Sequence, residues 1–180
     1  MIVGASDHGG WAIFVTIARD GTLLDRRRVE LVDENLPSIP HHHEAQLLPI
    51  AQGVALVERV RASAEKHAAL ALNEIASVMP NIAGIALRAC PPLPPTIAER
   101  ITNYRARNVA DWVMYRKALA VAAEARGWRV YWYDPKTVLA SAPEVQQLRK
   151  IVGAPWNNDH KLAMAAAIVS ARALSASALV

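Results

Sequence analysis

The chain has 180 residues, of which 53% are hydrophobic and 20% are charged, and its formal net charge is +4. This length predicts a single domain over residues 1–180, and the hydrophobic content excludes an intrinsically disordered chain. The single cysteine, Cys90, excludes an internal disulfide bond and a zinc site built from cysteines. The mild positive charge permits a nucleic-acid partner without requiring one.

Neither a signal peptide nor a membrane span is indicated. Residues 1–10 reach Asp7 and His8 too early for a signal peptide. The longest apolar stretch, residues 162–171, is too short to cross a bilayer. We therefore expect a cytoplasmic protein that does not bind membranes.

The first third of the chain predicts three antiparallel strands, over residues 1–6, 11–18 and 22–32. The helical spacing of apolar residues then predicts a long helix within residues 44–78, and the apolar run 82–89 predicts a buried fourth strand. Thr96 and Glu99 form a capping box, so a second long helix is expected from there to about residue 126.

The last third predicts a fifth strand at residues 130–133, one short helix within 135–151 and a final helix to about residue 175. Asn158 or Asp159 is the expected cap of that final helix. The order β-β-β-α-β-α-β-α predicts an α/β fold with a five-stranded mixed sheet flanked by helices. Right-handed crossovers place strands four and five beyond strand one.

This order resembles the ribonuclease H-like superfamily, which includes RuvC-like Holliday-junction resolvases. Strand one ends in an aspartate before a glycine turn, at Asp7, and Asp159 opens an alanine-rich final helix. The resemblance implies that both aspartates are metal ligands. Two acids of the RuvC pattern are replaced: the fourth strand offers Arg88, and one turn into the final helix stands Leu162.

Three carboxylates are the candidate ligands for Mg²⁺ or Mn²⁺, which prefer oxygen donors: Asp7, Glu44 and Asp159. Glu44 follows three consecutive histidines, and His43 and His160 are the candidate proton carriers. The alternative for the histidine run is an exposed loop in which Glu44 interacts with the helix dipole.

Basic side chains are the candidate contacts to nucleic acid. Arg88 is placed to contact a phosphate, and the second long helix adds four residues of this kind: Arg105, Arg107, Arg116 and Lys117. The alternative for these four is the solvated face of an amphipathic helix.

Two functions follow from these residues. The first is a divalent-metal-dependent nuclease or resolvase-like phosphodiester hydrolase that acts on DNA or RNA. The alternative is a catalytically degenerate ribonuclease H-like domain that binds nucleic acid or protein, with Arg88 paired to Asp7 in place of a metal. A relative of the actin-like ATPases is less favoured, since the chain has no room for their second domain. The alanine-rich last helix and exposed aromatic residues also favour a homodimer.

Overall fold

The computed structural model describes residues 1–177, apart from the side chains of residues 149, 150 and 177. Its five strands form one mixed sheet in the order β3-β2-β1-β4-β5. They are β1 (Ile2–Asp7), β2 (Trp11–Ile17), β3 (Leu23–Glu30), β4 (Gly84–Arg88) and β5 (Arg129–Tyr133). The first three strands pair antiparallel, and β4 and β5 run parallel to β1. The predicted sheet is therefore confirmed, including the position of strands four and five.

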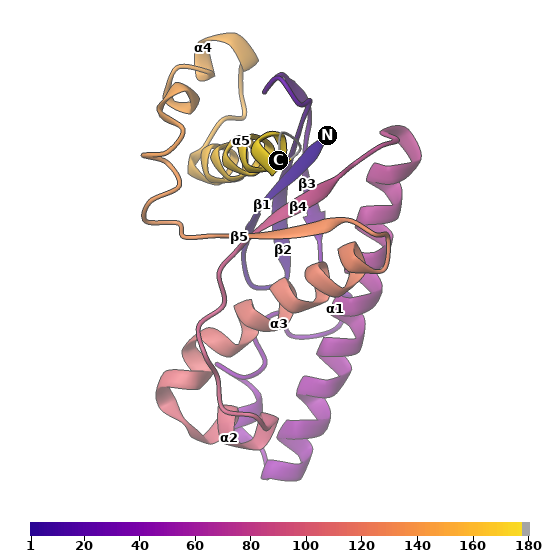
Figure 1. The fold of residues 1–180 in the computed structure, drawn as a ribbon. Coiled ribbons are helices and arrows are strands. Elements are labelled where there is room, and N and C mark those ends of the chain that lie inside the picture. Colours follow the sequence, from indigo (N-terminus) through magenta and orange to yellow (C-terminus); the bar gives the residue numbers. More distant parts are fainter. Residues whose placement is uncertain (178–180) are drawn as a thin grey trace.

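Helices cover both faces of this sheet (Figure 1). The long helices are α1 (Ile50–Val78), α3 (Tyr104–Glu124) and α5 (Asn158–Ser177), and the shorter ones are η1 (Ala45–Leu47), α2 (Ile97–Thr102), η2 (Pro143–Gln146) and α4 (Arg149–Val152). α5 packs on one face, while α1 and α3 pack on the other. None of the helices described is long and apolar enough to cross a membrane.

Alternate residues of β1 face these two layers, as the pleat of a strand requires. Val3 and Ala5 belong to the core beneath α1 and α3, whereas Ile2 belongs to the core beneath α5. Gly4 lies so close to α5 that a Cβ atom there would stand 1.9 Å from the carbonyl oxygen of Ala163. The same alternation directs Ser6 toward α5 and Asp7 toward α3.

Three helix predictions are wrong in detail. The helix expected over residues 96–126 is two helices, because Asn103 has an extended backbone and its side chain accepts the N–H of Ala106, which starts α3 anew. In place of the one short helix expected within 135–151, there are two, η2 and α4, and α4 extends to Val152. The cap of α5 is Asn157, whose Oδ1 accepts the backbone N–H groups of Asp159 and His160.

Candidate functional site at the carboxyl end of β1

Asp7 lies at the carboxyl end of β1 and forms a buried ion pair with Arg116 of α3. The Arg116 Nε donates to Asp7 Oδ2 at 2.7 Å, and its Nη1 donates to the Ala89 carbonyl at 3.2 Å. The side chains of Asp7 and Arg116 are 1% and 7% exposed. Because a guanidinium stays protonated at any ordinary pH, it neutralises the Asp7 carboxylate permanently.

Arg116 thus takes the place that the sequence suggested for Arg88. Arg88 pairs in register with Tyr133 at the end of β4, and its buried Nε has no hydrogen-bond partner among the described residues. The Tyr133 hydroxyl donates to the Ala5 carbonyl at 2.8 Å. Burial, together with the Asp7 charge, raises the pKa of Tyr133 to about 12, and Arg88 opposes this shift. The expected cation beside Asp7 is therefore present, but it comes from α3.

Asp159 approaches the end of β1 from the other face of the sheet. Its Oδ1 accepts the Ser6 hydroxyl at 3.0 Å and lies 2.8 Å from His8 Nε2. Since Ser6 and Asp7 point to opposite faces, these contacts keep the Asp159 carboxylate on the α5 side. The sequence correctly predicted that Asp7 and Asp159 lie at the same end of the central strand. It did not predict that they lie on opposite faces of the sheet.

An aromatic stack extends from this second carboxylate. The His8 ring stacks on Trp11 with centroids 4.0 Å apart, and the Arg28 guanidinium lies 3.9 Å from the Trp11 ring centroid. Arg28 also pairs with Glu30 of its own strand at 2.7 Å. The cation–π contact and the stack together fix the orientation of His8 toward Asp159.

The remaining predicted catalytic residues lie elsewhere. Glu44 and His43 are exposed, and Glu44 makes no capping hydrogen bond at the start of η1. His160 is buried, with its Nδ1 2.6 Å from Asn157 Oδ1. Burial and the nearby Arg26 cation lower the pKa of His160, against the opposing effect of Asp159. In the described part of the chain, none of these three side chains makes a hydrogen bond or ion pair with Asp7.

The residues present do not fit the pair of divalent cations that the fold implies. Such a pair needs several carboxylates around one point. Within residues 1–177, no three His, Cys, Asp or Glu side chains come together in a group that could hold a metal ion. Asp7 Oδ1 is buried without a partner in this part of the chain, yet it is one oxygen beside a guanidinium. Mg²⁺ or Mn²⁺ binding by Asp7, Glu44 and Asp159 stays a prediction.

The predicted nucleic-acid contacts on α3 divide between its faces. Arg105 and Arg116 share the face that carries Trp112, since these positions repeat at helical spacing. Arg107 instead lies over the ring of Tyr104, 5.2 Å from its centroid. Lys117 lines a separate cavity between α1 and α3. A cleft of about 260 Å³ opens on the Trp112 face, and its lining is Arg88, Pro91, Asn108, Val109, Trp112 and Arg116.

A second buried pair was not predicted from the sequence. Asp111 is fully buried, and its carboxylate accepts the backbone N–H groups of His41 and His42, each at 3.1 Å. Asp111 Oδ1 also lies 2.7 Å from His41 Nδ1. The sequence contained one indication of this pair: Asp111 interrupts an apolar stretch of the helix, between Ala110 and Val113.

The chain has a ribonuclease H-like fold of the RuvC type. Two solved structures of RuvC from Thermus thermophilus match it over nearly the whole chain. One, in complex with a Holliday junction substrate, has 16% identity and a TM-score of 0.57, and the match covers 98% of this chain and 94% of that one. The other has 17% identity and a TM-score of 0.52, covering 97% and 94%. No family model and no curated protein matches the sequence.

Proposed function

We propose that this protein is a catalytically degenerate ribonuclease H-like domain that binds nucleic acid at the carboxyl end of β1 without a divalent cation. The observation that carries the proposal is the buried ion pair between Asp7 and Arg116. An arginine on the central aspartate supplies the positive charge that a metal supplies elsewhere in the superfamily. Since the fourth strand adds Arg88 and no acid, the charge at this edge suits a bound phosphate better than a cation.

The cleft beside Arg116 supports nucleic acid as the partner. It combines two guanidinium groups, from Arg88 and Arg116, with the half-buried indole of Trp112. Arginines contact phosphates, and an aromatic ring accepts a stacked base whatever its sequence. One of the structural neighbours described above is a complex with a four-way DNA junction, which makes such a junction the first probe to use.

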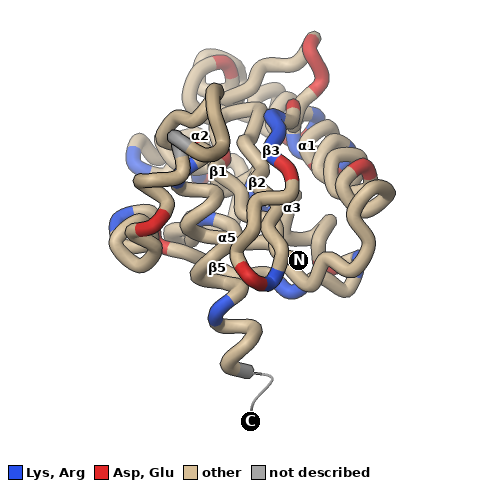
Figure 2. Tube along the Cα trace, turned by 90° about the horizontal axis from the view of Figure 1, so that it is seen from above, with Lys and Arg blue, Asp and Glu red and all other residues tan. Residues whose placement is uncertain are grey.

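The net charge is not part of this support. Figure 2 shows Lys and Arg positions interspersed with Asp and Glu over the trace, rather than one continuous basic band. Binding is therefore expected to depend on a few contacts at the cleft. A site of this kind gives a shallow dependence of affinity on salt.

The test measures binding of a fluorescently labelled four-way junction, a linear duplex and single-stranded DNA and RNA by anisotropy. Binding is expected in EDTA, unchanged by added Mg²⁺ or Mn²⁺, and without cleavage in any of these conditions. Metal-dependent cleavage that disappears in Asp7→Asn would instead establish the nuclease prediction. Absence of binding to every probe would overturn the proposal.

Variants locate the binding surface. Trp112→Ala is expected to weaken binding about tenfold, on the order of one lost base stack. Arg88→Ala should weaken it similarly on all sequences and reduce the salt dependence by roughly one phosphate contact. The matched control is Arg19→Ala, because Arg19 is exposed near the amino terminus of β1, at the opposite edge of the sheet. Equal loss in this control would contradict the assigned surface.

A further inference from the structure

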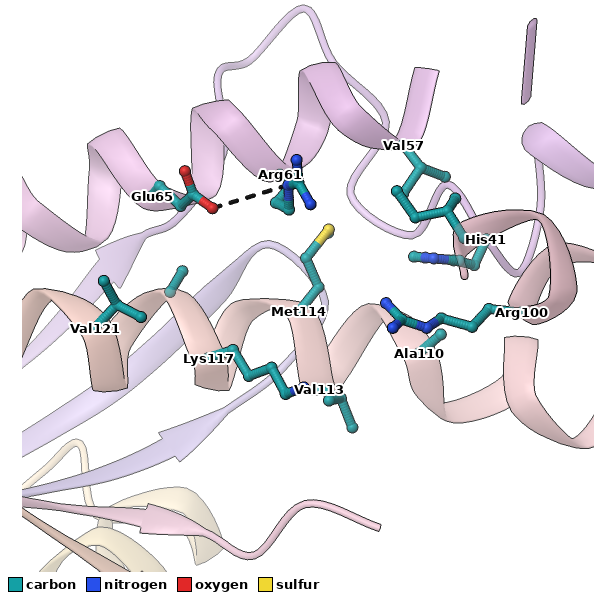
Figure 3. Close-up of a pocket in the computed structure, with 12 residues that line it drawn as sticks. His41, Val57, Arg61, Glu65, Arg100, Ala110, Val113, Met114, Lys117 and Val121 are labelled. Carbon is teal, nitrogen blue, oxygen red and sulfur yellow. Dashed lines mark ion pairs between the residues drawn. The ribbon is translucent and has the colours of Figure 1, made fainter. Parts of the chain in front are cut away.

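A cavity of about 300 Å³ lies between α1, α2 and α3 (Figure 3), and it shares no lining residue with the cleft of Trp112. Its volume is at the lower end of the range for small-molecule sites. Its apolar lining comes from all three helices: Val57, Ile97, Val113, Met114 and Val121. The cavity can therefore accept a molecule with an apolar body.

Positive charge exceeds negative charge around this cavity. Three cations line it, Arg61, Arg100 and Lys117, against one carboxylate, Glu65. Glu65 Oε1 lies 3.8 Å from Arg61 Nε, the pair drawn in Figure 3. Within residues 1–177, neither Arg100 nor Lys117 has a carboxylate at ion-pairing distance. Two of the three cations that line the cavity are therefore not neutralised by a carboxylate in this part of the chain.

Arg100 is held in position by the proline-rich loop. Its Nε donates to the Pro94 carbonyl at 2.7 Å, and its Nη2 donates to the Pro95 carbonyl at 2.8 Å. The capping box of Thr96 and Glu99 fixes the helix from which it projects. A guanidinium that is already oriented loses little conformational freedom when it binds an anion.

His41 lines the same cavity, and one of its ring nitrogens lacks a partner. The ring is oriented by Asp111, which lies 2.7 Å from Nδ1, so Nδ1 donates and Nε2 is directed away from the carboxylate. The His41 side chain is only 2% exposed, and Nε2 has no hydrogen-bond partner in the described part of the chain. A buried polar atom without a partner destabilises the fold, which indicates that something else satisfies it.

We propose that this cavity binds a small organic anion, a carboxylate or phosphate monoester on an apolar chain. The anionic group lies among Arg100, Lys117 and His41, whose unpartnered Nε2 contacts it. The apolar chain lies along Val57 and Met114. This site is independent of nucleic-acid binding at Asp7, because it uses other residues and another face of α3.

The test uses isothermal titration of the full chain with hexyl phosphate and hexanoate, and with hexanol and inorganic phosphate as partial probes. At least one of the two anions is expected to bind tenfold or more tightly than either partial probe, and the tighter one identifies the anionic group. Equal binding of hexanol would overturn the need for an anion, and equal binding of inorganic phosphate would overturn the need for an apolar chain. No binding of either anion would overturn the proposal.

Lys117→Met removes the charge at an exposed position and keeps most of the side-chain length. It is expected to weaken binding of the tighter anion at least fivefold, while the control Arg59→Ala, exposed on α1, leaves it unchanged. The ¹⁵N resonance of His41 Nε2 should shift on titration, which a purely structural histidine would not show. Trp112→Ala should leave anion binding intact, so failure of the junction experiment and failure of this one are distinguishable.

Discussion

Helix α3 contributes one partner to each of two buried pairs, Asp7 with Arg116 and His41 with Asp111, and the two differ in what they leave available. In the first, the arginine comes from the helix and neutralises an aspartate of the sheet. In the second, the helix provides the aspartate and orients a histidine of the preceding loop. Each pair leaves one buried atom unpartnered among the described residues, Asp7 Oδ1 and His41 Nε2. His41 lines the cavity between α1, α2 and α3, whereas in the first pair Arg116, and not Asp7, lines the Trp112 cleft.

This difference indicates separate purposes for the two pairs. A guanidinium on a buried carboxylate stays charged over the ordinary pH range and compensates the negative charge of Asp7. An imidazole oriented by a carboxylate can either accept or donate at its second nitrogen, so it can respond to a ligand. The first pair therefore stabilises the end of the sheet and holds Arg116 at the Trp112 cleft, whereas the second orients His41 in the cavity between α1, α2 and α3.

The largest expected effect comes from breaking the first pair. Arg116→Met leaves the Asp7 charge buried alone, and we expect a loss of about 3–5 kcal/mol in the free energy of unfolding. Asp7→Asn combined with Arg116→Met should lose much less, because no unpaired charge remains buried. Urea denaturation of both single variants and the double variant measures this coupling. Additive losses would show that the pair does not act as a unit.

We expect the pair of His41 and Asp111 to contribute less to the free energy of unfolding than the pair of Asp7 and Arg116. Asp111→Asn weakens the hydrogen bonds from two backbone N–H groups and from His41, and we expect a loss of about 2–3 kcal/mol. Amide hydrogen exchange at His41 and His42 should become faster as well. The control is Glu124→Gln, an exposed carboxylate near the end of the same helix. A change at Asp111 no larger than at Glu124 would contradict a buried role for this pair.

The sequence predicted the sheet and its strand order because strand and helix signals in this chain are strongly periodic and separated by clear turns. It also predicted that Asp7 and Asp159 lie at the same end of the sheet, because the order of strands and helices determines both positions. The sequence did not predict the break between α2 and α3 at Asn103. Within a helical pattern, a capping asparagine differs from a surface asparagine only in its backbone conformation, which the sequence does not show.

The partners of the charged residues could not be predicted for a different reason. Arg88 and Arg116 lie at the same end of the sheet, and which guanidinium reaches Asp7 depends on side-chain directions set by the pleat and by the rotation of α3. The contact of His41 with Asp111 joins residues 70 positions apart, and His41 lies in a turn outside the helices and strands. Neither periodicity nor local spacing contains that information.

A smaller effect is expected at the carboxylate on the other face of β1. Asp159 and His8 are 20% and 37% exposed at their side chains, so water competes for the contact between them. Asp159→Asn should lower the free energy of unfolding by roughly 1 kcal/mol, clearly less than the loss in Arg116→Met. Urea denaturation of the variant and of the unmodified chain checks this. A loss as large as that of Arg116→Met would indicate a more buried contact than the geometry implies.

The smallest and most pH-sensitive effect concerns a third aspartate, Asp33, which pairs with a histidine at the surface. Hydrogen bonds from His67 and then Ser63 lower the pKa of Asp33 to about 2 from its ordinary 3.8. The folded state therefore keeps this carboxylate ionised while the unfolded chain takes up a proton. The stabilisation is complete above about pH 4 and is lost as the pH falls toward 2. The urea midpoints of Asp33→Asn and the unmodified chain should consequently converge as the pH falls from 5 to 2. A difference that stays constant would show that the charge of Asp33 does not contribute to stability.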